Sequence, residues 1–367
     1  MSPAAQKALV PGPTRMMAAR GMLPLPRPGE LASVLYQLAL EPDAATADAA
    51  RATAAALPDK IVVGVLADAE VDPRVLDWLA PRCVQDRALH DALITAPAVA
   101  DETIVALAAA GDARAVDLIA QNEHRLLRHP AILAAMYGNP RARMSTVDRA
   151  VELAVRNQVK VEGIAAWDEL ARVITSGGGG ATADDDALFD QAMAGVAEVG
   201  DDASADPDAV PVGADGELVV EAAPTVDEKK VPINRMSVAA KIRLASVGNA
   251  FARNILIRDP SRLVAVAAIK SHGVSDSEAA RHAGNPNLCD DVVRYIASRK
   301  EWTRLYSVKV SLIMNPKSPL PEVARLLPHL REKDLKNVAK SKGVPSAVTA
   351  QAKKLISQRT GGPGRNK

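Results

Sequence analysis

A break that contains proline recurs at a nearly constant spacing in the C-terminal part of this chain. The breaks are Asp259-Pro260, Asn285-Pro286, Asn315-Pro316 and Val344-Pro345, at intervals of 26, 30 and 29 residues. Asn or Asp can take the left-handed conformation that ends a helix, and Pro is tolerated in the first turn of the next helix. Each break therefore predicts the end of one short helix and the start of another. A weaker series precedes it at Asp72-Pro73, Ala96-Pro97 and His129-Pro130.

Apolar residues follow these breaks at helical spacing. Examples are Leu263, Val264 and Ala267, then Val292, Val293 and Ile296, then Val323, Leu326 and Leu327. A helix with one apolar face must bury that face against a neighbour, so successive units are expected to stack.

The composition also favours helices. Hydrophobic residues make up 48% of the 367 residues but aromatic residues only 2%, so the apolar mass is mainly Ala, Leu, Val and Ile. Alanine-rich sequences favour helix. The alternating pattern of a β-sandwich or barrel is not found in the sequence. We therefore predict an all-α fold.

The stretch from Asn315 to Leu327 and the run from Ala283 to Ala297 resemble the bacterial leucine-rich-repeat-variant and HEAT-like helical repeat families. The resemblance covers mainly residues 259–357 and is faint over 60–156. It implies helical modules that stack as α-solenoids. It also implies a binding role, because members of these families mostly bind proteins and some HEAT-like members bind DNA. The variant family can carry a cysteine-rich iron–sulfur module. With only Cys83 and Cys289, this chain departs from that pattern, and no cluster is expected.

Charge is divided unevenly along the chain. Residues 1–175 have a formal charge of −3, residues 176–230 of −12 and residues 231–367 of +16. The middle segment combines a glycine run, Gly177 to Gly180, with many acidic residues, and such a composition cannot bury enough surface to order itself. Residues 184–193 could form a short docking helix, but we favour a frayed helix inside a disordered linker.

These patterns predict two α-solenoid-like helical repeat modules joined by an acidic disordered linker. The expected division is a flexible N-terminal segment at 1–29, a helical repeat module at 30–175, the linker at 176–230, a basic helical repeat module at 231–357 and a flexible tail at 358–367. One of the helices expected in the basic module covers residues 303–314.

The sequence contains no motif that indicates catalysis. It lacks a phosphate-binding glycine loop, a nucleophile elbow and an HExxH zinc motif. Glu123, His124 and His129 come nearest to a ligand cluster, but their spacing does not place both His on one helix face, so we interpret them as capping or surface residues. His272 and His282 could contact phosphate when protonated, but we favour their interpretation as ordinary solvated or helix-end histidines. We predict no enzyme activity, no cofactor and no metal.

The two cysteines lie too far apart in sequence to indicate a disulfide framework, which fits a reducing compartment. Prolines interrupt the N-terminal residues, so a signal peptide is not expected, and no apolar run is long enough to cross a membrane. We predict a cytoplasmic protein without a membrane partner. The sequence leaves the oligomeric state open.

The basic module offers the candidate binding surface. Its lysines recur at helical spacing over residues 331–342, opposite Leu335 and Val338. The candidate residues for binding a partner or a polyanion are Lys333, Lys336, Lys340, Lys353, Lys354, Arg299, Lys300, Trp302 and Arg304. Nucleic acid phosphate, an acidic protein or the chain's own acidic linker would suit this surface. A merely solvated face is the alternative.

We expect a non-enzymatic helical-repeat adaptor or scaffold that binds a protein partner. The alternative is a nucleic-acid or other polyanion binder that uses the basic C-terminal module, with the acidic linker as an autoinhibitory competitor. A HEAT-like enzyme such as a base-repair glycosylase is disfavoured, because no acidic residue beside an aromatic cleft is indicated.

Overall fold

The computed structural model describes residues 1–178, 181–199 and 229–360. Every regular element in these ranges is a helix, so the all-α prediction is confirmed. The chain divides into two compact units, unit 1 (Met1–Val161) and unit 2 (Glu162–Lys367). Among the described helices, none combines the length and the apolarity that crossing a membrane requires.

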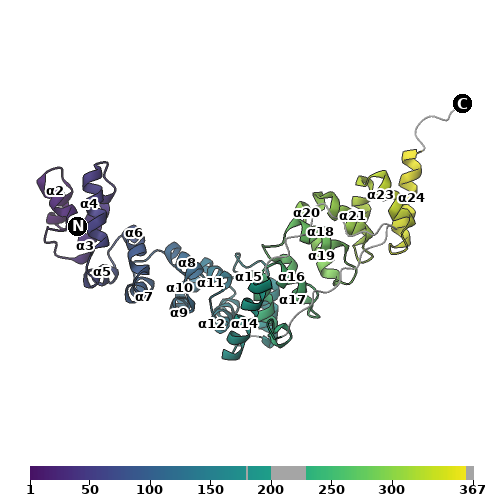
Figure 1. The fold of residues 1–367 in the computed structure, drawn as a ribbon, viewed down its shortest axis with the longest axis horizontal. Helices are drawn as coiled ribbons and strands as arrows, with labels where there is room; N and C mark the ends of the chain where they lie inside the picture. Colours follow the sequence, from purple (N-terminus) through teal and green to yellow (C-terminus); the bar gives the residue numbers. More distant parts are fainter. Residues whose placement is uncertain (179–180, 200–228, 361–367) are drawn as a thin grey trace. The chain divides into compact units, whose positions relative to one another are not determined.

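Unit 1 consists of short helices that follow one another closely (Figure 1). They are α1 (Pro3–Leu9), α2 (Pro13–Ala19), α3 (Pro28–Ala39), α4 (Ala44–Ala55), α5 (Asp59–Leu66), α6 (Pro73–Val84), α7 (Arg87–Thr95), α8 (Asp101–Ala110), α9 (Ala113–Ala120), α10 (Glu123–Arg128), α11 (Pro130–Gly138) and α12 (Met144–Arg156).

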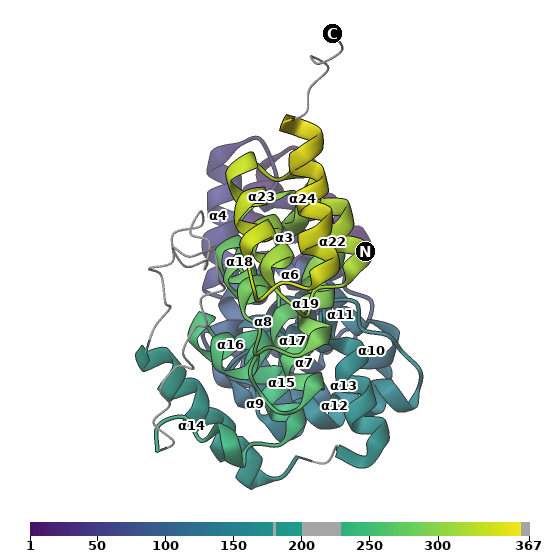
Figure 2. The same ribbon diagram turned by 90° about the vertical axis from the view of Figure 1, so that its right-hand side faces the viewer.

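Unit 2 is built in the same way. Its elements are α13 (Trp167–Val173), η1 (Ile174–Gly178), α14 (Ala183–Val199), η2 (Ile233–Arg235), α15 (Val238–Val247), α16 (Ala250–Leu256), α17 (Arg262–Lys270), α18 (Asp276–Gly284), α19 (Asp290–Ser298), α20 (Lys300–Arg304), α21 (Tyr306–Met314), α22 (Leu320–Leu326), η3 (Leu327–His329), α23 (Glu332–Lys340) and α24 (Ser346–Thr360). The helices pack in pairs, and α23 and α24 lie side by side in both views (Figure 2). This arrangement is consistent with a helical repeat.

Residues 1–29, expected to be flexible, instead contain α1 and α2. Both helices begin with Pro in the first turn, where its missing N–H costs nothing. Their alanines are buried against α3 and α4, and the Thr53 hydroxyl donates to the carbonyl of Ala19 at 2.7 Å. Pro3 and Pro13 therefore start helices within this segment.

The expectation of a disordered linker over 176–230 does not hold for its first part. Residues 183–199 form α14, which packs against α15 and α16 of unit 2. Phe189, Ala192 and Val196 form its buried face, and the guanidinium of the fully buried Arg243 lies 4.5 Å from the Phe189 ring centroid. Unit 2 begins at Glu162, so it also includes α13, which the sequence placed in the first module.

The described residues on either side of 200–228 lie together on unit 2. The Gln191 side-chain amide donates to the carbonyl of Lys229, and Lys230 Nζ lies 2.6 Å from Glu198 Oε2. Gly195 permits this approach, because a Cβ at this position would lie 2.5 Å from the Lys230 carbonyl oxygen. Residues 200–228, together with 361–367 of the expected C-terminal tail, lie outside the described residues.

In both units a buried asparagine joins a helix to the third helix before it in the chain. Asn139 Nδ2 donates to the carbonyls of Ala108 and Gly111 at 2.9 and 2.8 Å, so the end of α11 is bonded to the end of α8. Asn315 Nδ2 likewise donates to the carbonyls of Ala283 and Asn285 at 2.8 and 3.2 Å, which bonds α21 to α18. Each Oδ1 accepts the backbone N–H two residues later. Asn285 makes the same turn contact, because its Oδ1 accepts the backbone N–H of Asn287.

The left-handed caps predicted at Asn285 and Asn315 are wrong. Both residues have φ of −82° with extended ψ, and Asn139, which the predicted series did not include, has φ of −81° with extended ψ. A residue before Pro is sterically pushed to the extended region, so the Pro that starts the next turn also decides the conformation of the Asn. The Asn is therefore required for its side chain and not for its backbone freedom.

We expect Asn315→Ala to lower the free energy of unfolding by about 2–3 kcal/mol, because it removes a set of buried hydrogen bonds and leaves carbonyls unsatisfied. Asn157→Ala is the matched control, since exposed Asn157 makes one side-chain bond, to the carbonyl of Leu153; there the loss is below about 0.5 kcal/mol. Urea unfolding followed by circular dichroism measures both. Equal losses would show that the Asn315 bonds do not support the helix stack.

Candidate functional site

The lysine stripe predicted over 331–342 lies on α23. Leu335 and Val338 are buried, whereas Lys333, Lys336 and Lys340 are exposed. Lys336 Nζ pairs with Glu332 Oε1 at 2.6 Å, and this contact lowers the pKa of Glu332. Lys353 and Lys354 are exposed on α24. None of these five lysines lines any of the pockets described below.

The other predicted residues surround α20, which the sequence did not separate from the helix that follows it. The expected helix over 303–314 is broken at Leu305, whose extended backbone ends α20 and starts α21. No Pro or Gly marks this break. α20 packs against α18, α19 and α21, and a pocket lies on each of its two sides.

The first pocket, here called the basic pocket, has a volume of about 290 Å³. It is lined by residues of α20, α21, α22 and η3, namely Lys300, Thr303, Arg304, Lys309, Arg325, Leu326 and His329. Four side chains that carry positive charge at neutral pH thus meet in one place, with a histidine beside them. Charge and spacing selected Lys300 and Arg304 from the sequence. They did not select Lys309, Arg325 or His329, which the fold brings in from later helices.

The cations of the basic pocket are largely without acidic neighbours. Arg325 pairs with Glu322 on the same helix. The side chains of Lys300, Arg304 and Lys309 have no carboxylate partner within the part of the chain that the structure describes. Elsewhere in unit 2 many cations are paired, for example Lys241 with Asp259 at 2.8 Å. The positive charges of the pocket repel one another, and a bound anion would relieve this repulsion. The pocket therefore favours an anion.

In unit 1 an arginine at the position that corresponds to Arg304 is paired with an acid. Arg128 stands eleven residues before Asn139, and Arg304 stands eleven before Asn315, each at the end of its short helix. In unit 1, Arg128 Nη2 pairs with Asp101 at 2.9 Å, and Arg125 contacts the same carboxylate at 2.6 Å. Burial raises the pKa of Asp101, but the contacts with the two arginines together outweigh it, so the net shift of this pKa is downward. Two arginines therefore share an acid in unit 1, whereas Arg304 has none among the described residues.

The second pocket beside α20, here called the aromatic pocket, has a volume of about 430 Å³. Tyr295 and Trp302 meet edge to face, with ring centroids 6.1 Å apart. The Arg299 guanidinium lies 5.5 Å from the Tyr295 ring centroid. Ala165, Ile269, Lys270, Ser271, His272, Val274 and Glu301 complete the lining. The fold therefore brings two of the few aromatic residues of unit 2 into one pocket.

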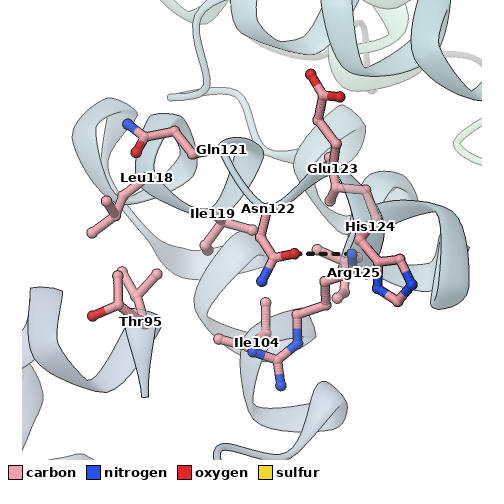
Figure 3. Close-up of a pocket in the computed structure, with 12 residues that line it drawn as sticks. Thr95, Ile104, Leu118, Ile119, Gln121, Asn122, Glu123, His124 and Arg125 are labelled. Carbon is pink, nitrogen blue, oxygen red and sulfur yellow. Dashed lines mark hydrogen bonds between the residues drawn. The ribbon is translucent and has the colours of Figure 1, made fainter. Parts of the chain in front are cut away.

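A third pocket lies in unit 1, among α7, α8, α9, α10 and α11, with a volume of about 630 Å³ (Figure 3). Its floor consists of Ile94, Ile104, Ile119, Leu126 and Ile132, with the half-buried Leu118 above them. Its rim carries the polar side chains of Thr95, Gln121, Asn122, Glu123, His124 and Arg125. Asn122 Oδ1 accepts the backbone N–H of Arg125 and so caps α10. We call this pocket the unit 1 groove.

The histidines considered in the sequence do not form a metal site within the described ranges, where no group of three His, Cys, Asp or Glu residues could hold a metal ion. His124 is an exposed rim residue of the unit 1 groove, and His129 Nδ1 lies 4.0 Å from Asp101 Oδ2. Cys83 is buried, which raises the pKa of its thiol to about 11. That thiol is protonated at neutral pH.

His282 lies in the last turn of α18, a helix-end position as expected, but it is not solvated. It is 1% exposed, and its Nδ1 has no hydrogen-bond partner in the described structure. Burial lowers its pKa from 6.5 to about 3, with smaller contributions from the positive charges of Arg281, Arg258 and Arg253. The side chain is therefore neutral at physiological pH and cannot contact a polyanion.

This burial predicts a pH dependence. Below about pH 6.5 the unfolded chain binds a proton at His282 and the folded chain does not, so stability falls as the pH falls towards 3. Between pH 6.5 and 4.5 this single group lowers the free energy of unfolding by about 2 kcal/mol. We expect His282→Leu to lose that part of the pH dependence, and His272→Leu, at an exposed histidine of the same unit, to keep it. Urea unfolding at several pH values measures the slopes, and unchanged slopes in His282→Leu would contradict the assignment.

Comparison with known proteins adds no family to this picture. No protein-family model, no curated protein and no solved structure matches the chain. The geometry of the three pockets is therefore the basis for inferring function.

Proposed function

We propose that this chain is a non-enzymatic helical-repeat protein that binds a polyanion through the basic pocket of unit 2. The observation that carries the proposal is the convergence of Lys300, Arg304 and Lys309 without carboxylate partners among the described residues. Such a cluster raises the local concentration of anions and binds phosphate or sulfate groups through charge-assisted hydrogen bonds.

The sequence alone favoured a protein partner, and the unit 1 groove supports that as a second function. Its apolar floor and polar rim are features of surfaces that bind a segment of another protein. In contrast to the basic pocket, its arginine is already paired, because Arg125 contacts Asp101 and the carbonyl of Val99. The groove therefore offers shape and apolar contact more than charge, and it fits an adaptor role for unit 1.

The finer architecture belongs to the same proposal. The bonds from Asn139 to α8 and from Asn315 to α18 repeat one connection in the two units. Stacking of such units within each part of the chain is the arrangement of an α-solenoid, as in HEAT-like and leucine-rich-repeat-variant proteins. Solenoid stacking places short helices such as α10 and α20 at the surface, where they line binding pockets.

Charge reversal at the basic pocket tests the proposal. We expect Lys300→Glu/Arg304→Glu to weaken binding of labelled duplex DNA and of heparin at least tenfold at low salt. The salt dependence on DNA should become shallower by roughly 0.9 for each lost phosphate contact. Fluorescence anisotropy at several salt concentrations measures both.

Lys353→Glu/Lys354→Glu is the matched control, because it changes the net charge equally but alters no pocket. It should cost much less affinity. Equal losses in the two variants would show that overall charge, and not the pocket, binds the polyanion. Failure of the unaltered protein to bind either polyanion at low salt would refute the function.

We also propose that the acidic residues 200–228 compete with the polyanion. This segment has nine Asp and Glu residues and no Lys or Arg. Its two flanks are held together on unit 2 by the contacts of Gln191 with Lys229 and of Glu198 with Lys230. The segment is therefore tethered to the unit that carries the basic pocket, which gives it a high effective concentration there.

Deletion of residues 201–227 tests this competition while it keeps α14 and its packing. We expect the deletion to strengthen binding of duplex DNA several-fold at low salt, measured by the same anisotropy titration. The control is a chain in which Asp and Glu of this segment are replaced by Asn and Gln, which keeps the length and removes the charge. It should match the deletion. Unchanged affinity in both chains would show that the segment does not compete.

A further inference from the structure

We infer that the polyanion bound by unit 2 is single-stranded nucleic acid, with a base in the aromatic pocket and the neighbouring phosphates in the basic pocket. The inference rests on the polyanion function proposed above and names its ligand class. The observation behind it is that α20 separates two pockets of different chemistry.

The side chains of α20 and its preceding residue divide between the two pockets. Arg299, Glu301 and Trp302 line the aromatic pocket. Lys300, Thr303 and Arg304 line the basic pocket. A helix carries side chains on both sides of its narrow backbone cylinder, so a ligand that crosses one short helix reaches both pockets. A nucleotide chain has the two parts that such a surface needs, a flat base and a charged backbone.

The two pockets differ in net charge, and this difference assigns the base and the phosphate. In the aromatic pocket, Lys270 Nζ is bonded to both carboxylate oxygens of the buried Glu169, at 2.9 and 3.0 Å. Arg299 lies 3.9 Å from Glu301, a carboxylate that would repel a phosphate. The basic pocket has no carboxylate in its lining. The aromatic pocket therefore suits a neutral base, and the basic pocket suits phosphate.

Trp302 is the side chain that would stack on the base. It is half-buried, and its contact with Tyr295 is edge to face, with the two ring planes 80° apart. Stacking on an exposed aromatic face beside a cationic backbone track is the usual means by which proteins hold single strands. Arg299 and Glu301 could bond the polar edges of the base.

A duplex does not fit this arrangement, because its bases are paired and stacked and cannot enter a side pocket. An acidic peptide would satisfy the basic pocket but has no general need for a ring beside it. The combination of the two pockets therefore favours a single strand.

The experiment compares three polyanions on the full-length protein. Labelled oligo-dT, a labelled duplex with the same number of phosphates and labelled heparin are titrated at the same low salt concentration, and tryptophan fluorescence is recorded with unlabelled oligo-dT. We expect oligo-dT to bind tightest and to quench tryptophan. Trp302→Ala should lower affinity for oligo-dT roughly tenfold and leave heparin binding nearly unchanged.

Two variants guard against simple loss of folding. Trp302→Phe keeps an aromatic face and should retain most of the affinity for oligo-dT while it loses the quench. Trp78→Phe in unit 1, at a half-buried tryptophan that contacts Tyr36, is the matched control and should keep both affinity and quench. Circular dichroism confirms that each variant is helical.

The outcomes separate this inference from the function on which it rests. Equal binding of oligo-dT, duplex and heparin without a quench that depends on Trp302 would overturn the single-strand assignment and leave polyanion binding in place. The absence of binding to all three at low salt would overturn both.

Discussion

The ends of short helices are the constraint on which this structure depends. A helix leaves its first four N–H groups and last four C=O groups without internal partners, and in the nine-residue α21 these are a large share of the backbone polar groups. Asn139 and Asn315 meet this constraint by donating to carbonyls at the end of the third helix before their own and accepting an N–H from the following turn. An amide side chain supplies two donors and an acceptor, whereas a hydroxyl has one donor and a carboxylate has none. One residue therefore ends a helix, starts the next turn and fixes its neighbour in the stack.

The need to pair buried polar groups also explains where positive charge remains available for a ligand. Two cations of unit 2 with little exposure are paired with acids: the buried Arg253 makes two bonds to Glu278, and the half-buried Lys270 is bonded to Glu169. A buried charge without a partner is strongly destabilising, and these ion pairs neutralise such charges. Lys300 and Arg304 are exposed, and water can solvate them until an anion replaces it. The break at Leu305 makes α20 a helix separate from α21, and residues of α20 line the two pockets that support the proposed function.

Much of the helical pattern is local and was predictable, as α17, α18 and α23 show, because apolar spacing and caps act within a few residues. The failures are also physical. The acidic composition around α14 suggested disorder, but the stripe of Phe189, Ala192 and Val196 meets an apolar surface on α15 and α16 that only the folded unit supplies. In the candidate site, charge and aromatic character selected Lys300, Trp302 and Arg304. Lys309, Arg325 and His329 carry no local signal that would join them to α20.

The sequence by itself determined the helical class, the periodic breaks, the apolar face of each helix and the concentration of positive charge after residue 231. These properties depend on neighbours along the chain and on the steric effect of Pro on the residue before it. Only the tertiary structure decided which helix each Asn bonds to, which cations find an acid, and that α20 has an aromatic pocket on one side and a basic pocket on the other. These outcomes join residues that lie tens of positions apart, such as Asn315 with Ala283 and Lys300 with Arg325, and their proximity is set by how the helices stack.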